Sequence, residues 1–269
     1  ADFPWMRLQS ALRDVLSSGG VATHAWLAIP STLSAEAAAT TAGLTAAVVD
    51  MQHGMIDFSD ALQMVSALSA HPPTPVARIP HQWPAADVSM IHKLLDAGYL
   101  GLICPLVDTA EQARAFVDAC VYPPKGSRSF GPTRAGMVYG GGEYLRMADE
   151  LIVKLVMIET QQGLDNLEDI LAVEGVDGAF IGPNDLSLAL GVPPSGAPTH
   201  PKVVAAIERI GRECSKRGKV AGIWCGETGF ALDMVKRDFR FVTLGTDVAA
   251  ISQHLRDSME RFNKLSSSE

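Results

Sequence analysis

Short apolar runs alternate with longer amphipathic stretches along the sequence, and the alternation repeats eight times. Such repeats are typical of βα units that build a parallel sheet. Eight units predict a (β/α)8 TIM barrel. The predicted strands span residues 22–27, 46–49, 75–77, 100–104, 154–158, 178–181, 221–223 and 241–244.

The stretches between these strands carry apolar residues three or four positions apart, which is the spacing of a helix with one buried face. Val203, Ile207 and Ile210 are one example. An extra N-terminal helix is predicted at residues 5–16, where it would close the bottom of the barrel. The segments 122–142 and 191–200 fall outside the repeat. Because neither resembles a linker between domains, residues 1–269 are expected to form a single barrel domain.

Composition and charge narrow the classes of partner. Apolar residues make up 47% of the chain and charged residues 19%, as in globular proteins. The net charge is −8, and no basic cluster is interleaved with aromatic residues, so nucleic acid is not expected as a partner. No apolar run is long enough for a membrane span and no signal peptide is recognised, which predicts a cytoplasmic protein with no membrane partner. The four cysteines form no CxxC pair and are expected to be buried free thiols.

Two acidic residues follow the predicted fifth and sixth strands. Barrel enzymes carry their reactive groups at the carboxyl ends of the strands, where Glu159 and Asp185 stand. A carboxylate at the mouth of a buried strand is costly unless it meets a cation, and two of them suit Mg²⁺ or Mn²⁺. The alternative is that each acid pairs with a nearby arginine, or that Asp185 caps the next helix.

His53 and Arg78 are candidates for catalysis at neighbouring strand ends. His53 lies three residues after Asp50, and an imidazole oriented by a carboxylate is a natural general base. Arg78 ends the third strand, where a guanidinium would favour a substrate carboxylate or a developing oxyanion. The alternatives are a structural histidine and an arginine that neutralises Glu159.

Several other chemistries find no support in the sequence. There is no GxSxG, HExxH, P-loop or strand-to-helix GxGxxG motif. A Schiff-base aldolase needs a lysine at the top of a strand. Lys154 starts its strand and alternates away from Glu159, and Lys219 precedes the seventh strand. A metal ion is therefore expected as the electron sink.

Six motifs occur in an order that resembles the HpcH/HpaI aldolase family of metal-dependent pyruvate aldolases, over residues 20–247. They are VVDMQHGMIDF, PVARIP, KLLDAG, YPPKGSRSFGPTRA, MIETQQGLDNL and EGVDGAFIGPNDLSLALG. The resemblance implies a (β/α)8 barrel that reversibly splits 4-hydroxy-2-oxo acids into pyruvate, or hydroxypyruvate, and an aldehyde. It also implies one divalent ion, Mg²⁺, Mn²⁺ or Co²⁺.

The resemblance further implies roles for individual residues. Glu159 and Asp185 match the metal ligands, and Arg78 matches the arginine that binds the 2-oxo oxygen. His53 matches the histidine that handles the proton of the C4 hydroxyl, and Asp96 matches the carboxylate partner of that histidine. The expected substrate-binding positions are Gln52, Arg78, Gly182, Pro183, Asn184, Asp185 and Trp224, with backbone amides around 183–185 receiving the substrate carboxylate.

Two departures from the family pattern affect these assignments. The segment between Arg78 and Asp96 is longer than expected, so Asp50 is the alternative carboxylate for orienting His53. Trp224 stands where the family usually carries a smaller apolar residue. Its ring would reshape the aldehyde pocket, or would serve only as packing.

Two other functions and two interpretations of the basic loop stay open. A lyase acting on citryl-CoA or malyl-CoA would require a basic patch at the barrel mouth, and a pyruvate- or metal-binding protein without catalysis would not require His53. The loop 125–134 is either a solvent-facing connection or an arm that completes a neighbouring subunit's site. The family suggests a homo-oligomer, a hexamer built as a trimer of dimers.

Overall fold

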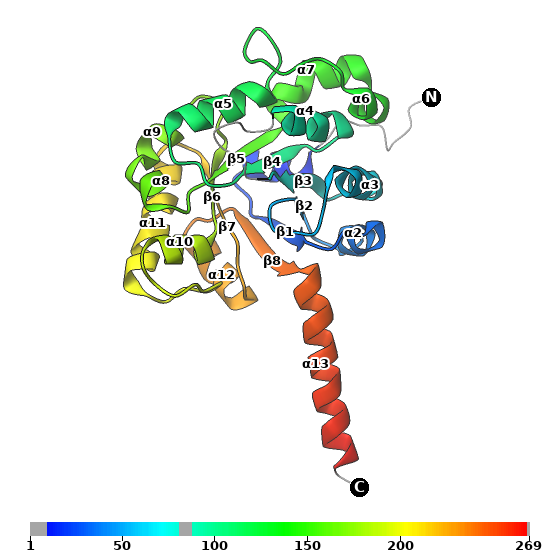
Figure 1. Cartoon of the computed structure of the whole chain (residues 1–269), viewed down its shortest axis with the longest axis vertical. Coiled ribbons are helices and arrows are strands. Elements are labelled where there is room, and N and C mark those ends of the chain that lie inside the picture. The colour runs from blue at the N-terminus through cyan, green and yellow to red at the C-terminus, as the bar shows by residue number, and fades with distance from the viewer. Residues whose placement is uncertain (1–9, 81–87, 268–269) are drawn as a thin grey trace.

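A computed structural model describes residues 10–80 and 88–267, and its eight parallel strands close into a barrel in sequence order (Figure 1). The (β/α)8 fold predicted from the sequence is confirmed, and every predicted strand overlaps an observed one. The strands are β1 Ala22–Leu27, β2 Ala46–Asp50, β3 Thr74–Arg78, β4 Gly101–Cys104, β5 Val153–Met157, β6 Gly178–Ile181, β7 Val220–Ile223 and β8 Phe241–Thr246.

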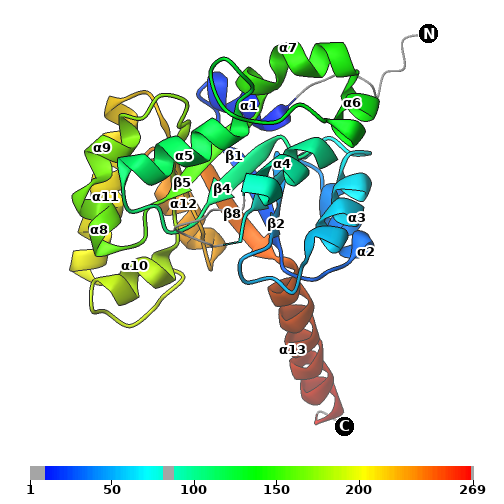
Figure 2. The same cartoon turned by 45° about the horizontal axis from the view of Figure 1, so that its top comes forward.

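Helices surround the barrel on most of its circumference, as Figure 2 shows from a second direction. Several begin with side-chain caps, such as the capping boxes of Asp57 and Thr109, which satisfy backbone amides that the helix leaves free. The helices are α1 Ala11–Ser17, α2 Thr32–Ala39, α3 Phe58–Leu68, α4 Val88–Ala97, α5 Ala110–Cys120, α6 Thr133–Tyr139, α7 Gly141–Leu151, α8 Gln161–Asp165, α9 Leu167–Leu171, α10 Pro183–Ala189, α11 Pro201–Lys216, α12 Thr228–Lys236 and α13 Asp247–Ser266.

The interior of the barrel is a separate core of aromatic and aliphatic side chains. Trp26, Phe180 and Phe241 belong to it, and Trp26 stacks on Phe180 with ring centroids 5.6 Å apart. His24 lies among these rings, with its Nε2 2.9 Å from the Thr243 hydroxyl. Burial lowers the pKa of His24 to about 3, so its imidazole is neutral and serves as a packing element.

The bottom of the barrel is closed by α1, as the sequence predicted. Leu12 is buried there, and its backbone amide donates to the Thr74 hydroxyl at the start of β3. Arg13 forms an ion pair with Asp177 ahead of β6, with Nη1 2.7 Å from Oδ1. Residues 5–9 of the predicted helix lie outside the described residues. The four cysteines are buried and free, as expected.

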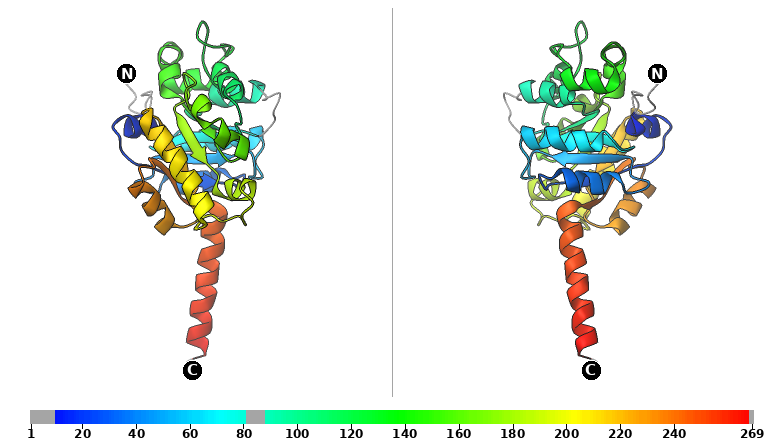
Figure 3. Two further views of the ribbon diagram at one scale, coloured as in Figure 1. Left: turned by 90° about the vertical axis from the view of Figure 1, so that its left-hand side faces the viewer. Right: turned by 90° about the vertical axis from the view of Figure 1, so that its right-hand side faces the viewer.

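Helix α13 differs from the other helices because it projects away from the barrel (Figures 1 and 3). Over its 20 residues, no side chain is buried. At 1.5 Å per residue it extends about 30 Å. No helix within residues 10–80 and 88–267 is both long and apolar enough to cross a membrane.

Close packing of neighbouring strands makes Gly178 a sensitive position. A methyl group there would overlap the Val220 carbonyl oxygen of the adjacent strand. We expect Gly178→Ala to lower the free energy of unfolding, measured by urea denaturation, by at least about 2 kcal/mol. As the control, Gly229→Ala in α12 meets nothing within 4 Å and should be neutral or stabilising. Equal stability of both variants would contradict the strand packing described here.

Candidate active site

A cavity of about 230 Å³ opens at the carboxyl ends of the strands, where a barrel of this kind places its reactive groups. It brings together most of the residues singled out from the sequence, whereas Gln52, Asp96 and Glu159 do not line it. The lining residues are Trp26, Ala28, Asp50, His53, Arg78, Met157, Phe180, Gly182, Pro183, Asn184, Asp185, Trp224 and Thr246.

A buried ion pair between Asp50 and Arg78 forms one side of this cavity. The two residues end β2 and β3 and are register partners, so their side chains emerge side by side. Arg78 donates from Nε to Oδ1 at 2.8 Å and from Nη2 to Oδ2 at 2.6 Å. Its guanidinium also lies over the ring of Trp26, 4.9 Å from the centroid. This bidentate geometry fixes the orientation of the guanidinium plane.

Asp50 receives three further hydrogen bonds. Trp26 Nε1 donates to Oδ2 at 3.1 Å, and the backbone amides of Gln52 and His53 donate to Oδ1 at 3.0 and 3.2 Å. Burial alone raises the pKa of Asp50, but the ion pair with Arg78 and these donors outweigh it and hold the pKa below its usual value. Asp50 therefore stays ionised at neutral pH.

These contacts change the roles expected from the sequence. Arg78 was considered as the partner of Glu159, and its observed partner is Asp50. Asp50 was the alternative carboxylate for the His53 imidazole, and it binds the backbone amide of His53. It thus anchors the segment that carries His53, while the His53 side chain is exposed at the rim of the cavity.

Glu159 lies two residues beyond β5 and is almost completely buried. Its Oε1 accepts a hydrogen bond from the backbone amide of Leu106 at 3.0 Å, but its Oε2 has no hydrogen-bond partner. Burial raises the pKa of Glu159 to about 7, and the nearby negative charge of Asp185 adds to the shift. A buried carboxylate oxygen without a hydrogen-bond donor is suited to ligate a cation.

Gly182 and Asp185 stand next to Glu159. A side chain at Gly182 would overlap Glu159 Oε2, so the absence of a side chain at Gly182 leaves room for this carboxylate beside the start of α10. Asp185 lies in the first turn of α10, whose N-cap is Gly182, so the alternative interpretation of Asp185 as an N-cap is wrong. Pro183 has no N–H, so the amides that can face a substrate carboxylate here are those of Asn184 and Asp185.

The two acids fit a single hard cation. Among the described residues, no group of three or more His, Cys, Asp or Glu side chains could hold a metal ion. Glu159 and Asp185 would therefore supply two oxygen ligands, and water or substrate would supply the others. That donor set suits an ion such as Mg²⁺ or Mn²⁺, which keeps several waters when it binds protein carboxylates.

Asp96 lies elsewhere in the chain. At the end of α4 it pairs with Arg128, whose Nη2 is 2.8 Å from Oδ1, and no hydrogen bond in the described part of the chain joins it to His53. Arg128 is fully buried and also bonds to the Tyr144 hydroxyl. The loop 125–134 is therefore anchored in the protein interior at Arg128, and is not a solvent-facing connection at that position. The long segment ahead of Asp96 includes residues 81–87, which lie outside the described ranges.

Trp224 also lines the cavity and is partly buried. The loop 191–200 packs on its ring, since a side chain at Gly196 would overlap Cζ3. Trp26, Ala28, Met157, Phe180 and Thr246 also line the cavity and were not anticipated. The sequence could have indicated two of them, because Trp26 and Thr246 stand near the carboxyl ends of β1 and β8.

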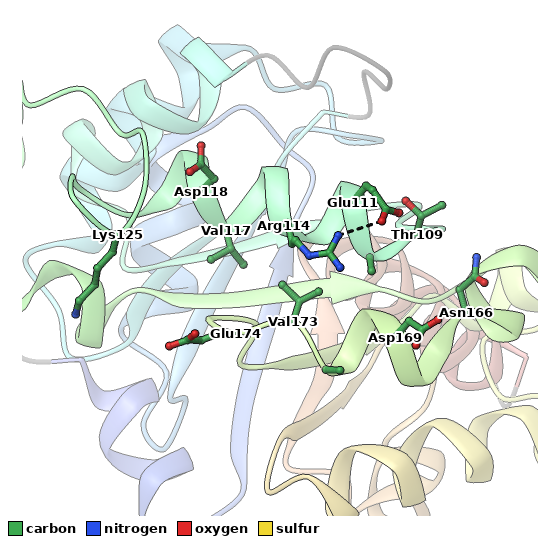
Figure 4. A pocket seen from close by; sticks show the side chains of 12 residues that line it. Thr109, Glu111, Arg114, Val117, Asp118, Lys125, Asn166, Asp169, Val173 and Glu174 are labelled. Atoms are coloured by element: carbon green, nitrogen blue, oxygen red, sulfur yellow. Dashed lines mark hydrogen bonds and ion pairs between the residues drawn. The ribbon is translucent and has the colours of Figure 1, made fainter.

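A second hollow of about 630 Å³ lies on the outer surface between α5 and α9 (Figure 4). Both acidic and basic side chains line it, and Arg114 forms an ion pair there with Glu111 at 3.0 Å. None of the residues expected to act in chemistry lines it. The cavity at the strand ends is therefore the candidate active site.

Comparisons with known proteins identify one family. A sequence profile described as HpcH/HpaI aldolase/citrate lyase matches residues 24–253. A hydroxypyruvate/pyruvate aldolase of Rhizorhabdus wittichii is 42% identical over 245 residues, covering 91% of this chain and 95% of that protein. A 4-hydroxy-2-oxo-heptane-1,7-dioate aldolase of Salmonella typhimurium is 34% identical, covering 95% of each chain.

The fold comparison gives the same assignment. The crystal structure of a HpcH/HpaI aldolase/citrate lyase family protein from Burkholderia cenocepacia superposes with a TM-score of 0.86 at 29% identity. The match covers 95% of this chain and all of that chain.

The buried ion pair should be sensitive to loss of one charge. Asp50→Asn leaves Arg78 buried without its counter-ion, so we expect the free energy of unfolding to fall by about 3–5 kcal/mol in urea titrations. Asp233→Asn breaks the exposed pair with Lys236 and should cost no more than about 1 kcal/mol. A similar loss in both variants would contradict the special role of Asp50.

Proton competition at Glu159 should make metal affinity depend on pH. Because its pKa is raised to about 7, a proton occupies the carboxylate below that pH and must leave before a cation binds. We expect the Mn²⁺ affinity, measured by calorimetry, to fall by up to about tenfold per pH unit between pH 7 and 5.5 and to be flat above pH 8. Glu143→Gln, at an exposed acid, should keep this profile, and a constant affinity from pH 5.5 to 8 would refute the assignment.

Proposed function

This chain belongs to the HpcH/HpaI aldolase/citrate lyase family, and we propose that the cavity at its barrel mouth is where a carbon–carbon bond is made and broken. The protein is an aldolase, a lyase that reversibly cleaves 4-hydroxy-2-oxo acids into a pyruvate-type 2-oxo acid and an aldehyde. The observation that carries the assignment of the site is the unpartnered Oε2 of Glu159 beside Asp185 and the Asp50–Arg78 pair.

Glu159 and Asp185 would hold one divalent ion, which we take to be Mg²⁺, Mn²⁺ or Co²⁺. When bound, the ion supplies Lewis-acid stabilisation of negative charge on the oxygens of the 2-oxo acid. Asn184 and Asp185 line the cavity in the first turn of α10, and their backbone amides would suit the carboxylate of that acid. Relatives named hydroxypyruvate/pyruvate aldolase support pyruvate or hydroxypyruvate as the 2-oxo acid.

Arg78 would bind the 2-oxo oxygen and stabilise the enolate that forms when the C3–C4 bond breaks. Its Nε and Nη2 donate to Asp50, and Nη1 donates no hydrogen bond to any of the described residues. That nitrogen can therefore donate to a substrate oxygen. Because Asp50 already fixes the guanidinium plane, this donor needs little reorganisation as charge develops.

His53 would take the proton of the C4 hydroxyl, directly or through one water molecule. In the direction of cleavage the hydroxyl oxygen becomes the carbonyl of the aldehyde, and the electron pair of the broken bond enters the enolate. In the direction of synthesis His53 returns the proton to the new hydroxyl. The hydrogen bond from its backbone to Asp50 keeps the segment next to Arg78, so the two groups act on the same substrate.

Trp224, together with Trp26 and Phe180, would contact the aldehyde part of the substrate. A cavity of about 230 Å³ is small and suits short acids. Among the described residues that line it, Arg78 is the one Lys or Arg, and it is paired with Asp50. A basic patch for the phosphates of a CoA ester is therefore not present in this lining, which favours a small aldehyde.

We further propose that the enzyme acts as a homo-oligomer in the cytoplasm, with a hexamer built as a trimer of dimers as the expected form. The absence of any buried residue on α13 supports an assembly, because a long helix of a barrel enzyme ordinarily buries one face.

Removal of metal provides the direct test of function. We expect EDTA to abolish pyruvate release from a panel of 4-hydroxy-2-oxo acids, in an assay coupled to lactate dehydrogenase, and added Mg²⁺, Mn²⁺ or Co²⁺ to restore it. Glu159→Gln removes one ligand and should lower kcat/KM by at least about a hundredfold, whereas Glu143→Gln should match the wild type. Full activity in EDTA would refute the metal-dependent mechanism.

A further inference from the structure

One residue beside the candidate active site has a strained backbone. Leu106 lies in the loop after β4 and has a φ of 52°, in the left-handed region that residues other than glycine rarely adopt. In the described part of the chain, Asp238 is the one other non-glycine residue with a positive φ, and it lies in the exposed turn after α12. Such strain persists only where the surrounding structure imposes it, and it is concentrated at functional sites.

The side chain of Leu106 does not account for this conformation. It is partly exposed and, among the described residues, it belongs to neither of the two clusters of core side chains. Core packing of Leu106 is therefore not what the strained conformation provides. The backbone of the residue is the part with a specific partner.

That partner is Glu159. The backbone amide of Leu106 donates to Oε1 of Glu159 at 3.0 Å, and Oε2 is the oxygen that has no hydrogen-bond partner. Oε2 lies beside Gly182 at the start of α10, the helix that carries Asp185. The amide thus restricts the rotation of a buried carboxylate and leaves the oxygen near Asp185 available for a cation.

The residue after Leu106 is fixed to the end of β5. The amide of Val107 donates to the carbonyl of Met157 at 3.1 Å, and its side chain is buried. Gly163 in α8 permits the close approach of this loop, since a methyl group there would lie 2.9 Å from the Val107 carbonyl oxygen. The backbone on the C-terminal side of Leu106 therefore has little freedom to relax.

Asp108 joins the same loop to the residue directly after Glu159. Its carboxylate accepts a hydrogen bond from the Thr160 hydroxyl, and its backbone carbonyl accepts one from the Asn166 side chain at 2.7 Å. Thr160 is also the N-cap of α8. The loop that carries the Leu106 amide and the segment that carries Glu159 are thus held together, which explains how the strained conformation persists.

We propose that Leu106 is a positioning residue for metal binding. Its left-handed backbone directs an amide at Oε1 of Glu159 and so presents Oε2 to a divalent cation, and the hydrogen bond between Asp108 and Thr160 holds this backbone in place. The inference rests on the proposed function, which makes Glu159 a metal ligand. Because the orientation exists before the cation arrives, binding loses less conformational entropy, as with other hydrogen-bond partners of metal ligands.

Two substitutions at Leu106 distinguish a backbone role from a side-chain role. Glycine deletes the whole side chain but adopts the left-handed conformation freely, whereas valine keeps an apolar side chain whose β-branch disfavours that conformation. We expect Leu106→Gly to bind Mn²⁺ with wild-type affinity in calorimetric titrations at pH 8, and Leu106→Val to bind it at least about tenfold more weakly. The reverse order, or equal affinity of the two variants, overturns the proposal.

Asp238 provides the matched control for backbone strain. It precedes β8 and therefore lies at the opposite end of the parallel barrel from Glu159. Asp238→Val should have a lower free energy of unfolding than Asp238→Gly, for the same reason as at Leu106, but both should bind Mn²⁺ with wild-type affinity. If Asp238→Val weakened Mn²⁺ binding as much as Leu106→Val, the loss would reflect general destabilisation and the positioning role would be overturned.

The hydrogen bond between Asp108 and Thr160 allows a rescue test. Thr160→Ala removes the hydroxyl and should weaken Mn²⁺ binding by about tenfold, whereas Thr160→Ser keeps a hydroxyl and should retain the wild-type affinity. Ser31→Ala removes the N-cap of α2 and controls for the loss of a helix cap, so it should leave Mn²⁺ affinity unchanged. Wild-type affinity in Thr160→Ala, or weak binding in Thr160→Ser, overturns the role of this hydrogen bond.

Binding of Mn²⁺ to Glu159→Gln separates this inference from the proposed function. If Glu159→Gln kept the wild-type affinity, Glu159 would not be a metal ligand and the proposed function of the site would fail. If Glu159→Gln lost affinity while Leu106→Val kept it, the metal site would stand and the positioning role of Leu106 would be overturned. Loss of affinity in both variants, with binding retained in Leu106→Gly, is the expected result.

Discussion

The active site depends on the ion pair between Asp50 and Arg78. Transfer of two charged groups from water into the protein costs desolvation free energy. In this barrel that cost is offset by the bidentate contact and by three further hydrogen bonds to the carboxylate. Because the donors come from β1, from β3 and from the turn after β2, a single carboxylate holds three neighbouring segments in place. Hydrogen bonds to Asp50 therefore help to fix the positions of Trp26, Arg78 and His53.

Glu159 is the opposite case, just behind the cavity lining at Gly182. It is as deeply buried as Asp50, yet one of its oxygens has no donor, and its pKa is raised where that of Asp50 is lowered. The difference lies in the neighbours, because Asp50 meets a guanidinium and Glu159 meets a second carboxylate, Asp185. The fold thus satisfies one acid completely and leaves one oxygen of the other without a partner, which suits the metal ligand proposed for Glu159.

Periodicity in the sequence sufficed to predict the eight strands, because parallel buried strands leave compact apolar runs. Positions at strand ends singled out His53, Arg78 and Asp185, which line the cavity, and Glu159, which lies beside Gly182. The partner of Arg78 was not predictable in this way. It follows from the register between β2 and β3, which is set by packing and not by a local motif. The burial of Arg128 against Asp96 depends likewise on contacts between α4 and a distant loop. Apolar residues such as Val248, Ile251 and Leu255 recur at helical spacing along α13, but the sequence does not show which surface covers them, and none of them is buried in the single chain.

The two-sided use of β1 constrains how this part of the sequence can evolve. Trp26 faces the cavity, whereas Ala25 and Leu27 face outward and line a surface groove between β1, α2 and the end of β8. Substitutions that keep size and polarity are compatible with both faces, but insertion or deletion of one residue exchanges the faces of everything beyond it, moving Trp26 outward and Leu27 inward. The length of β1 should therefore vary less among related enzymes than its composition, and natural variation at this edge of the barrel should consist of point substitutions.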